Sequence, residues 1–121
     1  MADQFDAERV YAAQSPAELA AEYDRVAESY DHVLEQHEWR MPQIVAGLVA
    51  WLLPREARIL DAACGTGLIG VHLADYGFTA LEGLDISAGM LEVARRKGVY
   101  AELACCALGE ALPYAERRFD A

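Results

Sequence analysis

Ile59-Leu-Asp-Ala-Ala-Cys-Gly-Thr-Gly-Leu-Ile-Gly70 is the stretch of this chain that indicates the fold most directly. A short apolar strand runs into Asp61 and then into three glycines at positions 65, 67 and 70. Glycine lacks a Cβ and tolerates positive φ, so the backbone of such a turn can approach a bound small molecule closely. A helical pattern follows at once, which predicts the strand–turn–helix unit of an α/β cofactor site.

Strand and helix patterns alternate outward from this turn. Downstream we expect a helix that ends before Gly77, a second strand, a helix capped by Ser87, and a third strand. Upstream, Ser15, Pro16 and Glu18 form the start signal of a long helix. The expected ranges are helices at 15–36, 42–53, 68–76 and 87–97, and strands at 58–63, 79–84 and 99–106. Two leading helices followed by β-α-β-α-β predict the first half of a Rossmann-like, doubly wound α/β fold, a parallel sheet with helices on both faces.

Three further expectations concern the organisation of the chain. Residues 1–14 form a frayed, flexible N-terminus, and residues 15–121 form the N-terminal cofactor-binding part of a larger domain. The helix at 42–53 places one set of apolar residues on a single face: Ile44, Val45, Leu48, Val49 and Leu52. Phe119-Asp120-Ala121 looks like the start of a fourth strand. Either the chain is therefore a fragment, or its open sheet edge is covered by another chain, such as a second copy in a homo-oligomer.

Composition narrows the classes of function. The 121 residues suit one small domain, and a net charge of −10 argues against binding the phosphate backbone of nucleic acids. No signal peptide and no run of apolar residues long enough to span a membrane is evident. Cys64, Cys105 and Cys106 indicate neither a disulfide framework nor a zinc site, so we expect reduced, buried thiols, no metal and a cytoplasmic location.

The glycine spacing alone does not identify which cofactor is bound. Gly65-x-Gly67-x-x-Gly70 matches the dinucleotide fingerprint. Asp85, at the end of the next strand, can accept hydrogen bonds from both ribose hydroxyls of an adenosine, or it can cap the helix that begins near Ser87. Asp61 favours S-adenosylmethionine, because a carboxylate inside the first strand can order the turn and lie near a cationic amino-acid group, which a pyrophosphate lacks.

Several segments together resemble the class I S-adenosylmethionine-dependent methyltransferases. Residues 60–67 resemble motif I of that superfamily, residues 83–91 its motif II region, and Leu112-Pro113-Tyr114 with Phe119-Asp120-Ala121 the approach to motif IV. Tyr23-Asp24 and Tyr30-Asp31 resemble the paired Tyr-Asp elements that precede the core. Within the superfamily the chain is most similar to the Williams–Beuren-region methyltransferase-like group.

This resemblance implies a role for each candidate residue. Gly65 and Gly67 would lie against the methionine part of the cofactor, and Asp61 would help to position its amino group. Asp85 would hold the ribose. The remaining contacts would surround the adenine or close over the cofactor: Ile86, Met90, the backbone near Leu108 and Gly109, and Tyr30. Many relatives carry an Asp at the position of Leu108, so adenine recognition here would depend on the backbone.

The expected function is methyl transfer to an acceptor that the sequence does not identify, a small molecule or a protein side chain. No catalytic base is assigned. His32, His37 and His72 are candidates, although a lone histidine is more often structural, and methyl transfer to a good lone pair needs no base. Two alternatives stay open: a non-catalytic half-domain that binds the cofactor or serves in assembly, and an NAD(P)-dependent oxidoreductase.

Overall fold

A computed structural model of the chain describes residues 5–121, and it confirms the Rossmann-like α/β class. The elements are α1 (Ala7–Ala12), α2 (Pro16–Gln36), α3 (Met41–Leu52), β1 (Ile59–Ala62), α4 (Leu68–Asp75), β2 (Leu81–Asp85), α5 (Ala88–Lys97) and β3 (Glu102–Cys105). The strands form a parallel sheet in the order β1-β2-β3. Asp61 pairs in register with Gly83, and Asp85 with Cys105.

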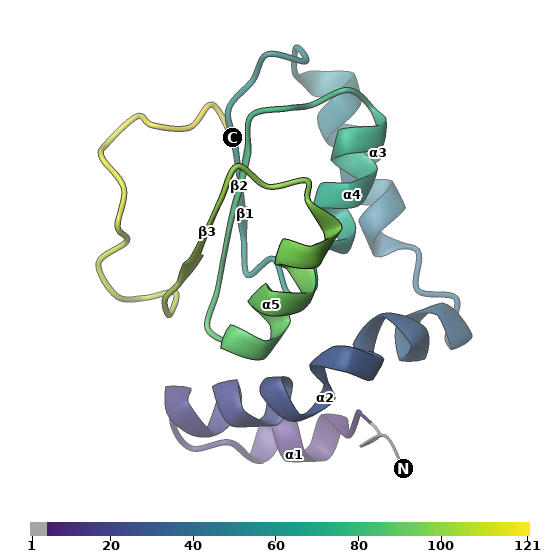
Figure 1. Ribbon diagram of the computed structural model, residues 1–121, viewed down its shortest axis with the longest axis vertical. Helices are drawn as coiled ribbons and strands as arrows, with labels where there is room; N and C mark the ends of the chain where they lie inside the picture. Colours follow the sequence, from purple (N-terminus) through teal and green to yellow (C-terminus); the bar gives the residue numbers. More distant parts are fainter. Residues whose placement is uncertain (1–4) are drawn as a thin grey trace.

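Helices α3, α4 and α5 lie on one side of this sheet (Figure 1), rather than on both faces as expected. The strand order gives the reason. Consecutive parallel strands that are also neighbours, joined by right-handed crossovers, place both connecting helices on the same face. On the opposite side runs the segment after β3, where Arg118 forms ion pairs with Glu82 at 2.9 Å and with Glu102 at 3.6 Å.

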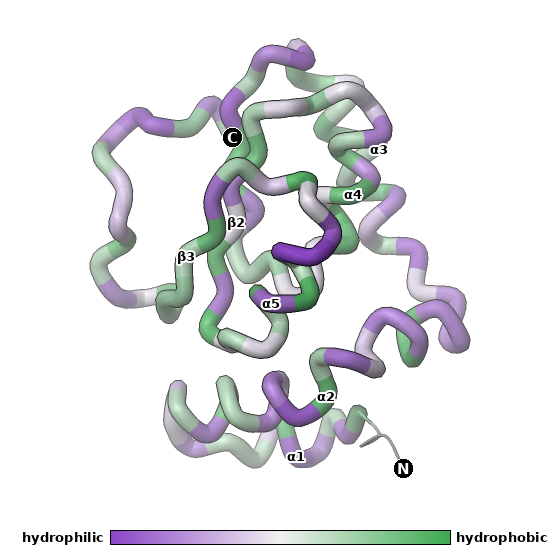
Figure 2. The backbone as a smooth tube through the Cα atoms, viewed as in Figure 1, coloured by the Kyte–Doolittle hydropathy of each residue, from purple (hydrophilic) through white to green (hydrophobic). Residues whose placement is uncertain are grey.

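Two apolar clusters hold these layers together. The larger one lies between the sheet, α3 and α4, and its buried members are Ala46, Ala57, Ile59, Leu73, Phe78 and Leu81. The smaller one joins α2 to α5 through Val26, Ala27 and Met90. The tube through α1 and α2 alternates between hydrophilic and hydrophobic residues (Figure 2), as expected for helices that pack along one face only.

Helix α2 begins where its start signal predicts. The Ser15 hydroxyl accepts a hydrogen bond from the Glu18 amide at 3.2 Å, and Pro16 occupies the first turn. The Glu18 carboxylate reaches back to the Gln14 amide at 2.7 Å, one residue before the partner of a standard capping box. This end of α2 is therefore tied to the segment that precedes it.

The expected apolar face of α3 packs only in part, through Val49. Ile44, Leu48 and Leu52 are 53%, 53% and 66% exposed, and Trp51 is 81% exposed. The face that packs on the core instead carries Ala46 together with Val49, Ala50 and Leu53. Ala46 and Ala50 on this face allow the α3 backbone to approach α4 closely, which larger side chains at these two positions would prevent.

The N-terminal region also differs from the expectation of a frayed segment. Residues 1–4 lie outside the described part, but Ala7–Ala12 forms α1, which Asp6 caps by accepting a hydrogen bond from the Glu8 amide at 2.9 Å. Figure 1 shows α1 beside α2, across the carboxyl ends of the strands. Among the helices formed by residues 5–121, none combines the length and the hydropathy that crossing a membrane requires.

The last residues lie along the free edge of β1. The Asp120 amide donates to the Arg58 carbonyl at 2.7 Å, and the Leu60 amide donates to the Ala121 carbonyl at 2.9 Å. The Asp120 carboxylate also accepts from the Arg58 amide at 2.8 Å and pairs with its guanidinium. Both partners advance in the same chain direction, so this segment begins parallel pairing with β1, although it is too short to form a strand.

Candidate functional site

A cavity of about 760 Å³ lies at the carboxyl ends of β1 and β2, beneath α1 and α2. Its walls come from the α1–α2 junction, from α2, from the turns after β1 and β2, and from the segment after β3. The lining residues are Val10, Tyr11, Ala13, Gln14, Ser15, Pro16, Leu19, Tyr23, Tyr30, Ala63, Gly65, Leu84, Asp85, Ile86, Met90, Cys106, Ala107 and Leu108. The carboxyl ends of parallel strands are where open α/β sheets bind ligands.

The turn after β1 has the backbone conformation that its glycines predict. Gly65 has φ +56° and Gly67 has φ +88°, and Ala63 adopts φ +59° despite its side chain. No atom outside the immediate chain neighbours lies within 4 Å of the position where a Cβ of Gly65 would stand. The backbone at Gly65 is therefore open to a ligand, as a close cofactor contact requires.

Asp85 joins the two turns that border the cavity. Its carboxylate accepts hydrogen bonds from the Gly65 amide at 2.8 Å and from the Ser87 amide at 2.9 Å, and the residue is only 8% exposed. The predicted capping role of Asp85 is met in part: its carboxylate accepts from the amide of Ser87, which is itself the N-cap residue of α5. Asp85 also lines the cavity, so the same side chain lies where a ligand could reach it.

The Asp61 side chain is held in place by Tyr100. The Tyr100 hydroxyl donates to Asp61 Oδ2 at 2.6 Å. Burial raises the pKa of the Asp61 carboxyl, the Tyr100 hydrogen bond lowers it, and the nearby charge of Asp85 raises it. Burial and the adjacent Asp61 also raise the pKa of the Tyr100 phenol, which therefore stays protonated and remains a donor.

Tyr100 explains two of the glycines beside this turn. A Cβ on Gly70 would stand 2.3 Å from the Tyr100 hydroxyl, and one on Gly67 would stand 2.9 Å from Cε2 of the same ring. The third glycine of the motif is therefore required by a neighbouring aromatic ring. A dinucleotide fingerprint assigns that position to helix–strand packing, and this is the role that the geometry gives it.

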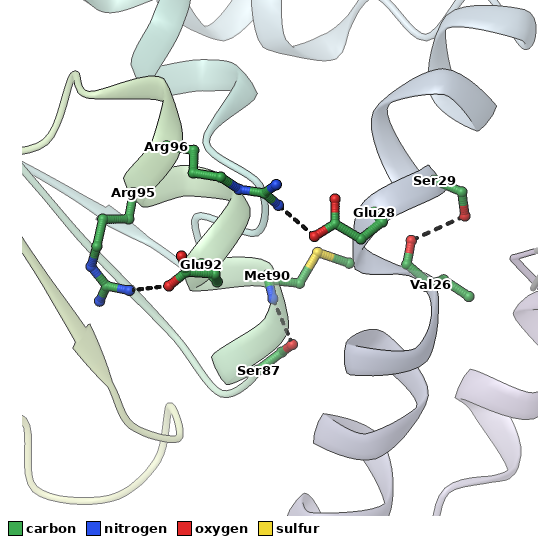
Figure 3. A network of polar contacts seen from close by, with 8 residues as sticks. All are labelled: Val26, Glu28, Ser29, Ser87, Met90, Glu92, Arg95 and Arg96. Carbon is green, nitrogen blue, oxygen red and sulfur yellow. Dashed lines mark hydrogen bonds and ion pairs between the residues drawn. The ribbon is translucent and has the colours of Figure 1, made fainter. Parts of the chain in front are cut away.

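Aromatic side chains of α2 form the wall of the cavity opposite the strands. Tyr23 and Tyr30 make an edge-to-face contact at 6.4 Å, and Phe5 packs on Tyr30 at 5.7 Å. Burial raises the pKa of both tyrosines, so both hydroxyls stay neutral. Met90 reaches from α5 toward α2 (Figure 3), is 1% exposed, and serves both the small core cluster and the cavity wall.

Most of the residues expected from the sequence meet at this cavity. Tyr30, Gly65, Asp85, Ile86, Met90 and Leu108 line it. Asp61, Gly67 and Gly109 are not among the described lining residues: the Asp61 carboxylate turns to Tyr100, and Gly67 faces the same ring. Gly109 has φ +98° beside Leu108, which is 57% exposed.

Some lining residues had escaped the sequence analysis. Tyr23 could have been found, because its Tyr-Asp pair repeats that of Tyr30 seven residues later. Val10 and Tyr11 belong to α1, for which Asp6, a favoured N-cap residue, was an available signal. Cys106 and Ala107 reach the cavity only because the chain turns there after β3.

The histidines, which were candidate bases, do not lie at the cavity, and of the three cysteines Cys106 lines it. His32, His37 and His72 do not line the cavity, and His37 Nδ1 lies 2.8 Å from the Val33 carbonyl oxygen. All three cysteines are free thiols. Cys64 is buried as expected, and burial raises the pKa of its thiol to about 12, whereas Cys105 is exposed, so the expectation of buried thiols is wrong for that residue.

The chain is similar to known methyltransferases. Residues 59–121 match the family described as "Methyltransferase domain". Human methyltransferase-like protein 27 is 42% identical over 120 residues, covering 93% of this chain and 49% of that protein. The dTDP-3-amino-3,6-dideoxy-alpha-D-glucopyranose N,N-dimethyltransferase of Streptomyces fradiae is 44% identical over 75 residues, covering 60% of this chain and 29% of that protein.

A solved structure is similar over most of the chain. Streptomyces venezuelae DesVI superposes with a TM-score of 0.59 at 28% identity, covering 77% of this chain and 39% of DesVI. The chain thus spans about half the length, or less, of the proteins that it matches. The match from β1 onward includes the glycine turn, Asp61 and Asp85, and the chain therefore belongs to the methyltransferase domain family.

Proposed function

We propose that this chain forms the cofactor-binding part of a methyltransferase that transfers a methyl group from S-adenosylmethionine to an acceptor, a small molecule or a protein side chain. The observation that carries the proposal is the cavity itself, which brings Gly65, Asp85 and Ile86 together beneath Tyr30. We place the cofactor-binding part at residues 15–121 and add α1, because Val10 and Tyr11 line the same cavity.

The charge of the site favours a cationic cofactor. Asp85 is the one charged residue among the described lining residues, and none of them is basic. Asp61 lies close enough for the charge of Asp85 to raise its pKa. Two carboxylates beside the glycine turn would repel a pyrophosphate and attract a sulfonium and an ammonium group, since complementary charges favour one ligand over another.

The lining residues fit the remaining parts of S-adenosylmethionine. We propose that the open backbone at Gly65 receives the methionine part and that Asp85 accepts the ribose hydroxyls. An apolar environment for adenine would come from Ile86, Met90 and Leu108. Tyr30 would close the cavity from α2, and Asp61, Gly67 and Gly109 would act from behind the lining residues, by shaping the turns.

The bound cofactor would supply an electrophilic methyl group, with its sulfur leaving as the thioether of S-adenosylhomocysteine when an acceptor lone pair bonds to the methyl carbon in line. The residues of this chain then have to bind and orient the cofactor and exclude water from the site, rather than exchange protons. The neutral hydroxyls of Tyr23 and Tyr30 and the apolar side chains of Val10 and Leu19 are suited to that task. We assign no catalytic base.

Calorimetric titration tests the proposal directly. We expect the 121-residue chain to bind S-adenosylhomocysteine and to show no comparable affinity for NAD. Tighter binding of NAD would overturn the proposal and favour an oxidoreductase. Binding of S-adenosylhomocysteine by a chain that methylates no acceptor, while a longer chain does, would assign the present residues to binding alone.

The role of Asp85 can be tested in the same titration. Asp85→Ala should weaken S-adenosylhomocysteine binding by roughly 1–3 kcal/mol, because it removes a charge-assisted acceptor at the cavity wall. Asp75→Ala is the matched control, since Asp75 is an exposed carboxylate at the end of α4 and does not line the cavity. An Asp85→Ala protein that is folded by circular dichroism and binds as tightly as the control would refute the ribose role.

A further inference from the structure

Two carboxylates of α2 connect that helix to the turns of the cavity. We propose that Asp24 and Asp31 are positioning residues that latch α2 onto the turns after β1 and β2, and so hold Tyr23 and Tyr30 over the bound cofactor. The inference rests on the proposed function, because the ligand in question is S-adenosylmethionine.

Asp24 fastens the helix to the turn after β2. Asp24 Oδ1 accepts from the Ser87 hydroxyl at 2.5 Å and from the Gly89 amide at 2.7 Å. Ser87 is fully buried, and its Oγ also accepts from the Met90 amide at 3.0 Å. A negative charge at the N-terminus of α5 is favoured by the helix dipole, so this contact is stronger than one between neutral groups.

The backbone at this contact is shaped for Asp24. A Cβ on Gly89 would stand 2.9 Å from Asp24 Oδ1 and 3.0 Å from Asp24 Cα. Any side chain at position 89 would therefore push α2 away from α5. The close approach of the two helices thus depends on a glycine whose φ is not itself unusual.

Asp31 fastens the helix to the glycine turn. Its Oδ1 accepts from the Thr66 hydroxyl, and its Oδ2 pairs with Lys97 Nζ at 2.5 Å. Thr66 is 1% exposed and lies between the two positive-φ glycines of the turn. A shift of Asp31 would therefore displace Thr66 and with it the backbone of Gly65, which lines the cavity.

The spacing of the two latches fits one face of a helix. Asp24 and Asp31 are seven residues apart, about two turns, so both side chains project in nearly the same direction. Tyr23 and Tyr30 precede them by one residue each, and both line the cavity. One helical repeat thus places two anchors on the turns and two aromatic rings over the ligand space.

The two turns and α2 consequently share one polar network. Asp24 binds Ser87, the Ser87 amide donates to Asp85, and Asp85 accepts from Gly65, which lines the cavity. By linkage, a ligand that orders these turns must also strengthen the docking of α2. Loss of the Asp24 and Asp31 contacts must then lower the affinity for that ligand by the same factor.

The test compares Asp24→Asn, Asp31→Asn and the double variant with Glu28→Gln. Glu28 is the matched control because it pairs with Arg96 between the same two helices (Figure 3) and loses the same charge, but its side chain is 76% exposed and does not touch either turn. Binding of S-adenosylhomocysteine is measured by calorimetry, and amide hydrogen exchange of α2 is followed with and without this ligand.

We expect the double variant to bind S-adenosylhomocysteine about tenfold more weakly or worse, as the loss of charge-assisted hydrogen bonds predicts. The ligand should protect the α2 amides in the wild type and in Glu28→Gln but not in the double variant, while β1 and β2 stay protected in all three. Double-variant binding within about twofold of the wild type, with ligand-dependent protection of α2 retained, would overturn the latch. No binding by the wild type itself would overturn the proposed function, and the positioning role with it.

A second pair of variants keeps the test decisive if the double variant does not fold. Thr66→Val removes only the hydroxyl that donates to Asp31 and keeps the buried shape, whereas Thr66→Ser keeps the donor. Weaker binding and faster α2 exchange in Thr66→Val, with rescue in Thr66→Ser, support the latch. Equal behaviour of both variants and the wild type would contradict it.

Discussion

At the scale of single residues, the contact between Asp61 and Tyr100 determines how the glycine turn is built. The Tyr100 ring fills the space that Gly67 and Gly70 leave open, and its hydroxyl binds the carboxylate that ends the apolar part of β1. Tyr100, which lies just before β3, thus sets both the backbone shape and the charge environment of the turn.

Tyr100→Phe separates these two roles. The ring and its contacts with the glycines remain, but the hydrogen bond that lowers the pKa of Asp61 is lost, so that pKa should rise further. The loss of one buried hydrogen bond should cost about 1 kcal/mol of stability. The pKa is measured by NMR titration of the carboxyl carbon of Asp61, with Tyr76→Phe, an exposed tyrosine, as the control.

The pH dependence of this variant has a definite sign. Burial raises the folded-state pKa of Asp61 above its unfolded value, so the folded state binds the extra proton between the two values. The free energy of unfolding contributed by Asp61 therefore falls as the pH rises through that interval, and Tyr100→Phe widens the interval. A pKa of Asp61 that is unchanged or lower in the variant would contradict this account.

At the scale of the elements, helix ends could be predicted better than helix faces. Ser15, Ser87 and Gly98 lie at helix ends, as their local signals indicate, because a cap is satisfied by groups within a few residues of it. The face of α3 could not be predicted in this way. Ile44, Leu48 and Leu52 stay exposed. Ala46 and Ala50 pack on the core beside Val49 and Leu53, because the two small residues permit close contact with α4.

The N-cap of α2 carries a prediction at this scale. Ser15→Ala removes the acceptor for the Glu18 amide and should lower the free energy of unfolding by about 1 kcal/mol. Ser15→Asp keeps an acceptor at the same place and should retain most of the stability. Urea unfolding of the three proteins measures the difference. Equal midpoints for wild type and Ser15→Ala would show that the cap contributes nothing to folding.

At the scale of the whole molecule, the excess of negative charge acts against compaction. The chain holds 20 acidic and 10 basic residues. Several basic side chains form ion pairs that are largely exposed, such as Arg95–Glu92 and Arg96–Glu28, and exposed pairs add little stability. The repulsion among the remaining carboxylates is therefore not offset locally.

Salt should consequently stabilise the protein. Raising sodium chloride from about 0.01 M to about 0.15 M shortens the Debye length from about 30 Å to about 8 Å, which screens this repulsion. We expect the melting temperature to rise by a few degrees over that range, as measured by differential scanning calorimetry. Potassium chloride should give the same result, because the effect depends on ionic strength. A lower melting temperature at higher salt would mean that the ion pairs outweigh the net charge.

The sequence by itself determined the α/β order, the position of the glycine turn and most of the helix and strand ranges. These features depend on the backbone freedom of glycine, on capping and on the period of the apolar residues, all of which act over a few neighbouring positions. The local pattern predicted Gly65 and Asp85, and the family resemblance implied four more of the residues that line the cavity: Tyr30, Ile86, Met90 and Leu108.

Only the tertiary structure decided what surrounds those residues. Tyr100 reaches Asp61 from 39 positions away, and Asp24 and Asp31 reach the turns across more than 30 positions. Such contacts depend on how α2 and β3 are placed against the sheet, which no local pattern encodes. The packed face of α3 and the closing of the cavity by α1 were decided in the same way, because burial is a property of the folded chain as a whole.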